Sequence, residues 1–185
     1  RKLHEVVKRL AAFGLVINIE KSHFLQDKVE YLGFEFSAAG YAPLKSASPK
    51  VEGYPTPKSR KDIQKFMGLI NYYRSHIHNL AMIDAPLYEL VKKKKRFIWT
   101  DECEKAFQQL KHQFKQRLTL SPLKREGQFE LYSDASGVAC GAVLVQNGKL
   151  IEFFSRTFTP VEQRYSCHDR EALAVVAAIL HWRNI

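Results

Sequence analysis

The fold of this chain is decided by residues 128–155, which read QFELYSDASGVACGAVLVQNGKLIEFFS. The pattern here is that of short strands, and in the first of them the apolar Phe129 and Leu131 alternate with polar residues. Asn147 and Gly148 form a pair that strongly favours a tight hairpin turn. The sequence therefore predicts three strands, at residues 128–134, 141–146 and 150–155.

Two acidic residues in this part of the chain are candidate metal ligands. Asp134 ends the first strand, on the face opposite the apolar side chains of that strand. Glu171 precedes the most apolar run, residues 172–180, in a final helix that we expect Pro160 to open. Two carboxylates placed together could hold a divalent cation, because Mg²⁺ prefers oxygen ligands. A strand-end cap and a solvated helix acid remain alternatives for the two residues.

Helical signals dominate the middle of the chain. Ser59 followed by Asp62 resembles a capping pair, and an apolar stripe at helical spacing predicts a helix at residues 60–76. We expect a short helix at 84–92 and a longer helix that Thr100 caps. These helices and the later strands together predict an α+β fold.

The first part of the chain carries weaker signals. Apolar spacing predicts a helix at residues 1–13, with Gly14 at its C-terminal end. Alternating residues at 15–19 and a strand-like stretch at 28–36 predict two short strands or a hairpin. Four prolines predict a loop or extended linker at residues 41–58.

The positive charge lies in the first two thirds of the chain. Residues 1–125 hold 24 Lys and Arg against 12 Asp and Glu, whereas residues 126–185 hold 5 against 7. Basic side chains on one surface bind a phosphate backbone without sequence preference, because binding releases the counterions of that backbone. The basic part therefore predicts contact with nucleic acid, and a role in solubility alone is the alternative.

The composition also excludes several classes of protein. With 45% hydrophobic and 26% charged residues among 185, the chain is expected to form folded cores. The run at residues 172–180 is about half of the ~20 residues that a membrane helix needs. We expect an intracellular, cytoplasmic protein that is not secreted and has no membrane partner. The side chains that lack metal-ligand spacing, and that we assign to packing or surface, are Cys103, Cys140, Cys167, His76 and His78.

One face of the helix at 60–76 is a candidate binding surface. Gln64, Gly68 and Tyr72 share this face, and a glycine inside a helix costs about 1 kcal/mol relative to alanine. Either close packing against another helix or the close approach of a nucleic-acid minor groove would explain Gly68. The run of basic residues at 92–96 is interpreted as a solvated turn or a duplex contact.

The order of motifs along the chain resembles a known family. The C-terminal motifs are LYSDAS (131–136), GAVLVQ (141–146), FSR (154–156), EQRY (162–165) and REALA (170–174). They resemble the opening of the ribonuclease H domain in polyproteins of gypsy-type long-terminal-repeat retrotransposons. The motifs that resemble the same polyprotein after its polymerase active site are GLVIN (14–18), EK (20–21), YLG (31–33), FMGLINYYR (66–74), PL (86–87), FIWT (97–100) and AFQQLK (106–111).

The resemblance assigns roles to the two acids. It implies that Asp134 and Glu171 are catalytic metal ligands for Mg²⁺ in the hydrolysis of RNA within an RNA–DNA hybrid. The third aspartate of the family is expected after Ile185, and the polymerase aspartates are expected before Arg1. We therefore expect an incomplete site in which the chain alone is inactive.

The resemblance also assigns a template–primer surface. It implies that Gln64, Gly68 and Tyr72 lie on the thumb helix of a reverse transcriptase and contact the duplex. Tyr31 and Gly33 match the primer-grip hairpin. The residues implied to contact phosphates are Lys61, Lys65 and Arg74.

Three segments are expected from this resemblance. Residues 1–48 end the polymerase palm with its primer-grip hairpin, residues 49–96 form the helical thumb, and residues 97–185 form a connecting helix and a truncated ribonuclease H-like mixed sheet with one helix. The expected partners are a template–primer duplex or hybrid and the rest of the polyprotein, which would act in a virus-like particle. The alternatives are a domesticated, non-catalytic nucleic-acid-binding module and a decayed reading frame.

Overall fold

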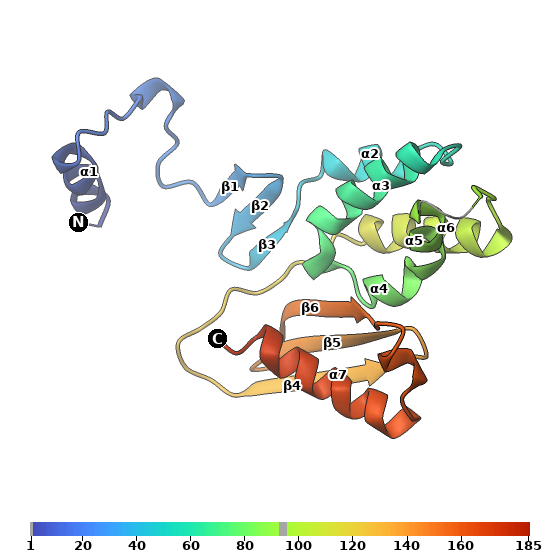
Figure 1. Cartoon of the computed structure of the whole chain (residues 1–185). Helices are drawn as coiled ribbons and strands as arrows, with labels where there is room; N and C mark the ends of the chain where they lie inside the picture. Colours follow the sequence, from blue (N-terminus) through green and yellow to red (C-terminus); the bar gives the residue numbers. More distant parts are fainter. Residues whose placement is uncertain (1, 93–95) are drawn as a thin grey trace.

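The structure is a computed structural model that describes residues 2–92 and 96–185. It confirms the α+β class, with helices and two three-stranded antiparallel sheets. Figure 1 shows a first helix that stands apart, a small sheet, a cluster of helices, and a second sheet covered by a long helix. Part of the basic run, residues 93–95, lies outside the described residues.

The N-terminal segment extends away from the rest of the chain (Figure 1). Helix α1 spans Lys2–Ala12 and buries none of its residues, and Gly14 follows it with φ +72°. The strand expected just after Gly14 is not formed, because no neighbouring strand pairs with this stretch in the described part of the chain. A 3₁₀ turn, η1 (Ile19–Lys21), forms there instead, and the Asn18 side chain accepts a hydrogen bond from its last backbone N–H.

The first sheet contains the predicted hairpin and one unpredicted strand. Strand β1 (Lys28–Tyr31) pairs with β2 (Phe34–Ser37), which pairs with β3 (Gly40–Pro43). The loop predicted at residues 41–58 is therefore wrong, since this stretch holds the end of β3 and the short helix α2 (Ala47–Glu52).

The prolines of this stretch fit regular structure for a positional reason. Pro43 ends β3, an edge strand of the sheet, where the missing N–H removes no hydrogen bond between strands. Pro49 is the third residue of α2, and the N–H groups of the first turn have no partner inside a helix.

The helical cluster forms around α3 (Arg60–Tyr72), whose predicted apolar stripe is buried. The Ser59 side chain caps α3 by accepting a hydrogen bond from Asp62 N at 3.3 Å, which confirms the capping pair. The helix ends four residues before the predicted residue 76, because Tyr73 N turns back to Ile70 O at 3.0 Å and a 3₁₀ turn follows. The remaining elements are η2 (Arg74–His76), α4 (Leu80–Ile83), α5 (Ala85–Val91) and α6 (Asp101–Lys115).

Helix α6 packs into the same core as α2, α3 and α5. Its N-terminal cap is Thr100, as predicted, and its buried face includes Phe107, Leu110 and Phe114. Phe107 meets Phe66 of α3 with ring centroids 4.7 Å apart. One apolar core therefore extends from α2 to α6.

The second sheet confirms the three strands predicted at the C-terminal end. Strands β4 (Phe129–Ala135), β5 (Ala139–Gln146) and β6 (Lys149–Thr157) pair antiparallel in chain order. Asn147 and Gly148 form the predicted turn, with φ +51° and +71°. Helix α7 (Cys167–His181) covers one face, where Ala174 and Ala178 are buried (Figure 1).

The prediction that Pro160 opens the last helix is wrong. A separate 3₁₀ turn, η3 (Glu162–Arg164), follows Pro160. The Glu162 carboxylate fixes this turn by accepting hydrogen bonds from the Arg156 guanidinium at 3.0 Å and from Thr159 N at 2.7 Å. Helix α7 begins only after Ser166, whose side chain accepts from Asp169 N.

The second sheet turns its other face toward the helical cluster, and polar contacts join the two. The Arg74 guanidinium donates to the Ser155 carbonyl at 2.7 Å, and Ala81 N donates to the Ser155 hydroxyl at 3.0 Å. Tyr41 of β3 exchanges two backbone hydrogen bonds of 2.9 Å with Leu120, in the connection between α6 and β4. No described helix has the length and apolar character needed to cross a membrane.

Candidate nucleic-acid interface

The face of α3 that carries Gln64, Gly68 and Tyr72 is exposed, while the opposite stripe of the helix is buried. A Cβ built on Gly68 would meet no atom within 4 Å. Close packing against another helix therefore does not explain this glycine in the part of the chain that is described. The structure brings the three predicted residues together on one open helical face.

The hairpin between β1 and β2 continues this face. The Tyr72 hydroxyl donates a hydrogen bond to the Leu32 carbonyl, and the Tyr72 ring stacks on Phe34 with centroids 5.5 Å apart. Tyr31 and Leu32 are largely exposed at the tip of the hairpin. Residues 40 positions apart in the sequence thus form one continuous surface.

Gly33 is required by the tyrosines that pack against the hairpin. Its φ is +80°, and a Cβ there would lie 3.1 Å from the Tyr73 hydroxyl and 3.2 Å from a ring carbon of Tyr72. The space beside Gly33 is thus occupied by these two side chains. Gly33 fixes the position of Tyr72 on the candidate face.

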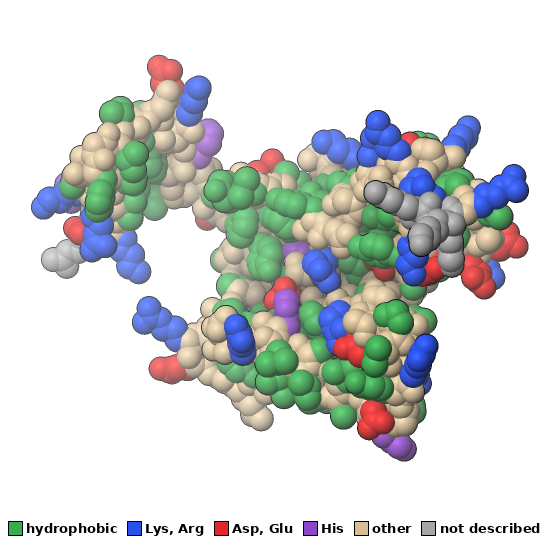
Figure 2. All heavy atoms as spheres, in the orientation of Figure 1, with side chains coloured by type: hydrophobic (Ala, Val, Ile, Leu, Met, Phe, Trp, Pro, Cys, Tyr) green, Lys and Arg blue, Asp and Glu red, His purple; other side chains and the backbone are tan. Residues whose placement is uncertain are grey.

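The predicted phosphate contacts have two different environments. Lys61 and Lys65 are exposed on α3, beside the candidate face. Arg74 is also exposed, but its guanidinium is held by the Ser155 carbonyl. Figure 2 shows Lys and Arg side chains along the outer edge of the helical cluster.

The two candidate acids come from different layers. Asp134 pairs with Gly141 across β4 and β5, whereas the adjacent pair of Ala135 and Cys140 packs toward α7. Because side chains alternate across a strand, Asp134 lies on the face turned away from α7. Its carboxylate is exposed and accepts a hydrogen bond from Ala135 N at 2.9 Å.

Glu171 lies on the exposed side of α7, where its carboxylate accepts a weak hydrogen bond from the Cys167 thiol at 3.6 Å. Within residues 2–92 and 96–185, no group of three or more His, Cys, Asp or Glu side chains is placed to hold a metal ion. The oxygen donors suit Mg²⁺, which proteins hold through one or two carboxylates together with water and substrate phosphates. Any ion held by Asp134 and Glu171 would therefore take its other ligands from water, substrate or other residues.

The structure also buries two titratable groups that the sequence reasoning did not single out as sites. Asp84 is 2% exposed and one of its oxygens has no partner, and burial raises the pKa of its carboxyl to about 7. His76 is 4% exposed between the Phe34 and Tyr41 rings, and burial lowers its pKa to about 4. Asp84 precedes Ala-Pro at a helix start, a pattern that usually indicates a solvated cap.

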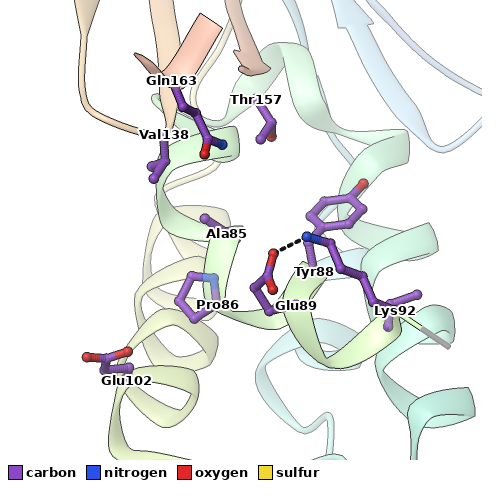
Figure 3. A pocket seen from close by; sticks show the side chains of 10 residues that line it. Ala85, Pro86, Tyr88, Glu89, Lys92, Glu102, Val138, Thr157 and Gln163 are labelled. Atoms are coloured by element: carbon purple, nitrogen blue, oxygen red, sulfur yellow. Dashed lines mark hydrogen bonds and ion pairs between the residues drawn. The ribbon is translucent and has the colours of Figure 1, made fainter. Parts of the chain in front are cut away.

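A cavity of about 650 Å³ lies away from the candidate face, between α5, the start of α6 and one end of the second sheet (Figure 3). Its walls include Pro86, Val138 and Gln163, and an ion pair between Glu89 and Lys92 lies at its edge. None of the predicted site residues lines this cavity.

Comparison with known proteins identifies the family. Residues 99–185 match the family described as the RNase H-like domain found in reverse transcriptase. The whole chain aligns with the Tf2-3 and Tf2-4 transposon polyproteins of Schizosaccharomyces pombe at 32% identity. The chain is homologous to the reverse transcriptase and ribonuclease H region of gypsy-type retrotransposon polyproteins. The resemblance drawn from the motifs is thereby confirmed.

The chain spans 14% of the length of those polyproteins. Its fold is also similar to solved structures of a foamy viral protease-reverse transcriptase. The structure in complex with double-stranded DNA aligns with 98% of this chain and with 33% of the foamy viral chain, at a TM-score of 0.84 and 22% identity. The structure in complex with an RNA/DNA hybrid aligns with 97% of this chain and with 25% of the foamy viral chain, at a TM-score of 0.83 and 23% identity.

Proposed function

We propose that this segment binds the template–primer duplex in a reverse transcriptase that copies RNA into DNA and hydrolyses the RNA of RNA–DNA hybrids. The observation that carries the proposal is the open surface at Gly68, with Gln64 and Tyr72 on either side along one helical face. The structural neighbours that were solved with double-stranded DNA and with a hybrid support it.

The side chains of this face suit the backbone and groove of a duplex. Gly68 lets the helix approach closely, the Gln64 amide can donate to groove acceptors, and Tyr72 is held in place by the Leu32 carbonyl. Lys61 and Lys65 would neutralise phosphates beside the groove. Phosphate and shape contacts of this kind carry little sequence preference.

Asp134 and Glu171 are the two acids that we assign to ribonuclease H chemistry in the longer polyprotein. Mg²⁺ would there activate water and stabilise the leaving oxygen. The role of the two side chains in this chain is to present carboxylate oxygens from β4 and α7, and the remaining ligands would come from outside residues 1–185. We expect no hydrolysis of a hybrid by these residues alone.

The same proposal covers the functional segments and the place of action. Residues 1–48 would end the palm, 49–96 form the thumb, and 97–185 contain the connecting helix and the ribonuclease H-like part. Helix α6 packs in the core of residues 49–96, so this segment and the start of 97–185 would move together. We also propose an intracellular place of action, within a virus-like particle, where thiols such as the exposed Cys167 stay reduced.

Gly68→Leu tests the thumb assignment. We expect the variant to be as stable as the parent or more stable, because leucine favours helix by up to about 1 kcal/mol over glycine and the site is open. We expect affinity for a labelled duplex to fall about tenfold or more, because the leucine would project into the groove. Gln109→Leu, at an exposed position of α6, is the matched control and should bind normally. Unchanged binding by Gly68→Leu would exclude this face as the interface.

Salt dependence tests the electrostatic part. If about three phosphates are neutralised, affinity for a hybrid should fall roughly 40-fold between 50 and 200 mM salt. Fluorescence anisotropy at four salt concentrations would measure the slope. The double variant Lys61→Gln and Lys65→Gln should lower the slope of log affinity against log salt concentration by about two. An affinity that does not change with salt would contradict contact with the phosphate backbone.

A further inference from the structure

A small hollow beside Asp134 is formed by both parts of the molecule. Its volume is about 100 Å³, and its walls come from β4 and β5 and from the turn that precedes α4. Tyr132, Ser133 and Asp134 line one side, and His78 and Asn79 line the other. A hollow of this size suits a small polar group such as a phosphate.

The turn that carries His78 is held firmly against the sheet. The Asn79 carboxamide oxygen lies 2.0 Å from the point where a Cβ on Gly141 would be, so only glycine leaves room for it. Asn79 has φ +51°, a left-handed conformation that asparagine tolerates. The His78 ring packs edge-on against Phe153 with centroids 5.2 Å apart.

The contacts of Ser155 fix the same turn on both flanks. Arg74 donates to its carbonyl and Ala81 N donates to its hydroxyl. His78 and Asp134 line one hollow, and both residues are exposed.

We propose that His78 binds a phosphodiester of the nucleic-acid strand that passes Asp134. The Asp134 carboxylate repels a phosphate in the absence of a cation, so hydrogen-bond donors beside it favour the approach of a strand, and the His78 imidazole is one of the donors in this hollow. Imidazole always carries at least one N–H donor and binds phosphate oxygens. This inference rests on the proposed role of Asp134 and extends that site to a residue of the thumb-like half.

Substitution of His78 gives the first test, on residues 1–185 with a labelled RNA–DNA hybrid at low salt. His78→Ala should weaken binding about tenfold, the usual loss for one hydrogen bond to a charged group. His78→Gln keeps an N–H donor and should restore most of the affinity. His112→Ala removes an exposed histidine from α6 and should bind as the parent does. Equal binding by His78→Ala and the parent would overturn the inference.

NMR titration with the same hybrid separates this inference from the proposed function. The inference expects the His78 ring signals and the Ala135 amide signal to shift together. If the Ala135 signal shifts and the His78 signals do not, the inference is wrong and the role of Asp134 stands. If only the Gly68 amide shifts, both the inference and the role of Asp134 are wrong, and the thumb assignment stands.

Discussion

Asp84→Asn is expected to raise the free energy of unfolding at pH 8 by about 2–4 kcal/mol. Burial raises the pKa of this carboxyl from 3.8 to about 7, so at pH 8 the folded protein holds a buried charge that the Arg74 guanidinium offsets only in part. A shift of this size corresponds to about 4 kcal/mol, and the asparagine amide removes the charge but stays buried. Urea denaturation at pH 8 would measure the gain.

The free energy of unfolding depends on pH through both buried groups. Because the folded-state pKa of Asp84 lies above the unfolded value, its contribution is fully present below pH 3.8 and is lost as the pH rises through about 7. His76 acts in the opposite direction. Its pKa is lowered from 6.5 to about 4, so stability falls as the pH drops from 6.5 to 4.

The two buried groups should therefore cancel between about pH 4 and 6.5 in the parent protein. Asp84→Asn should reveal the contribution of His76. In this variant the free energy of unfolding should rise by about 3 kcal/mol as the pH increases over this window. His76→Phe, which keeps an aromatic ring between Phe34 and Tyr41, should reveal the opposite slope from Asp84. An Asp84→Asn profile that runs parallel to that of the parent would show that Asp84 does not titrate in the folded state as described.

Gly40→Ala is expected to cost about 3 kcal/mol or more of folding stability. Gly40 has φ +134°, which side chains other than glycine rarely adopt, and a Cβ there would lie 2.0 Å from the Leu120 carbonyl oxygen. That oxygen belongs to the backbone and accepts a hydrogen bond from Tyr41 N, so it cannot move without breaking the bridge between β3 and Leu120. The connection between α6 and β4 would separate from the first sheet.

Gly148→Ala is the matched control for this prediction. Gly148 also has positive φ, at +71°, but a Cβ there would meet no atom within 4 Å. Only the backbone strain remains, about 1–2 kcal/mol. Thermal and urea unfolding of both variants would measure the difference. If Gly40→Ala costs no more than Gly148→Ala, the contact with Leu120 is not as tight as the structure has it.

Features with short-range causes were predictable from the sequence. The caps at Ser59 and Thr100 and the Asn147-Gly148 turn each depend on residues within four positions, and all three are confirmed. The open face at Gly68 followed from helical spacing, and the choice between packing and exposure needed the structure. The family followed from the order of the motifs, which no single residue specifies.

Proline positions show where sequence reasoning failed. A proline breaks a helix or a sheet only where its missing N–H is needed, and the sequence does not say which N–H groups have partners. Pro43 and Pro49 stand where none is needed, so β3 and α2 form. The alternation at residues 15–19 gave the opposite error, since a strand also needs a neighbour to pair with.

The sequence by itself determined the local elements, the basic character of the first 125 residues and the resemblance to the family. The tertiary structure decided which side chains share a site. Arg74 and Ser155 are 81 positions apart, and Tyr72 and Leu32 are 40 apart. Asp84 is buried only because α4 and α5 meet α6 and the second sheet. Local periodicity reflects neighbours along the chain, whereas hydrogen-bond partners and burial depend on how distant segments pack.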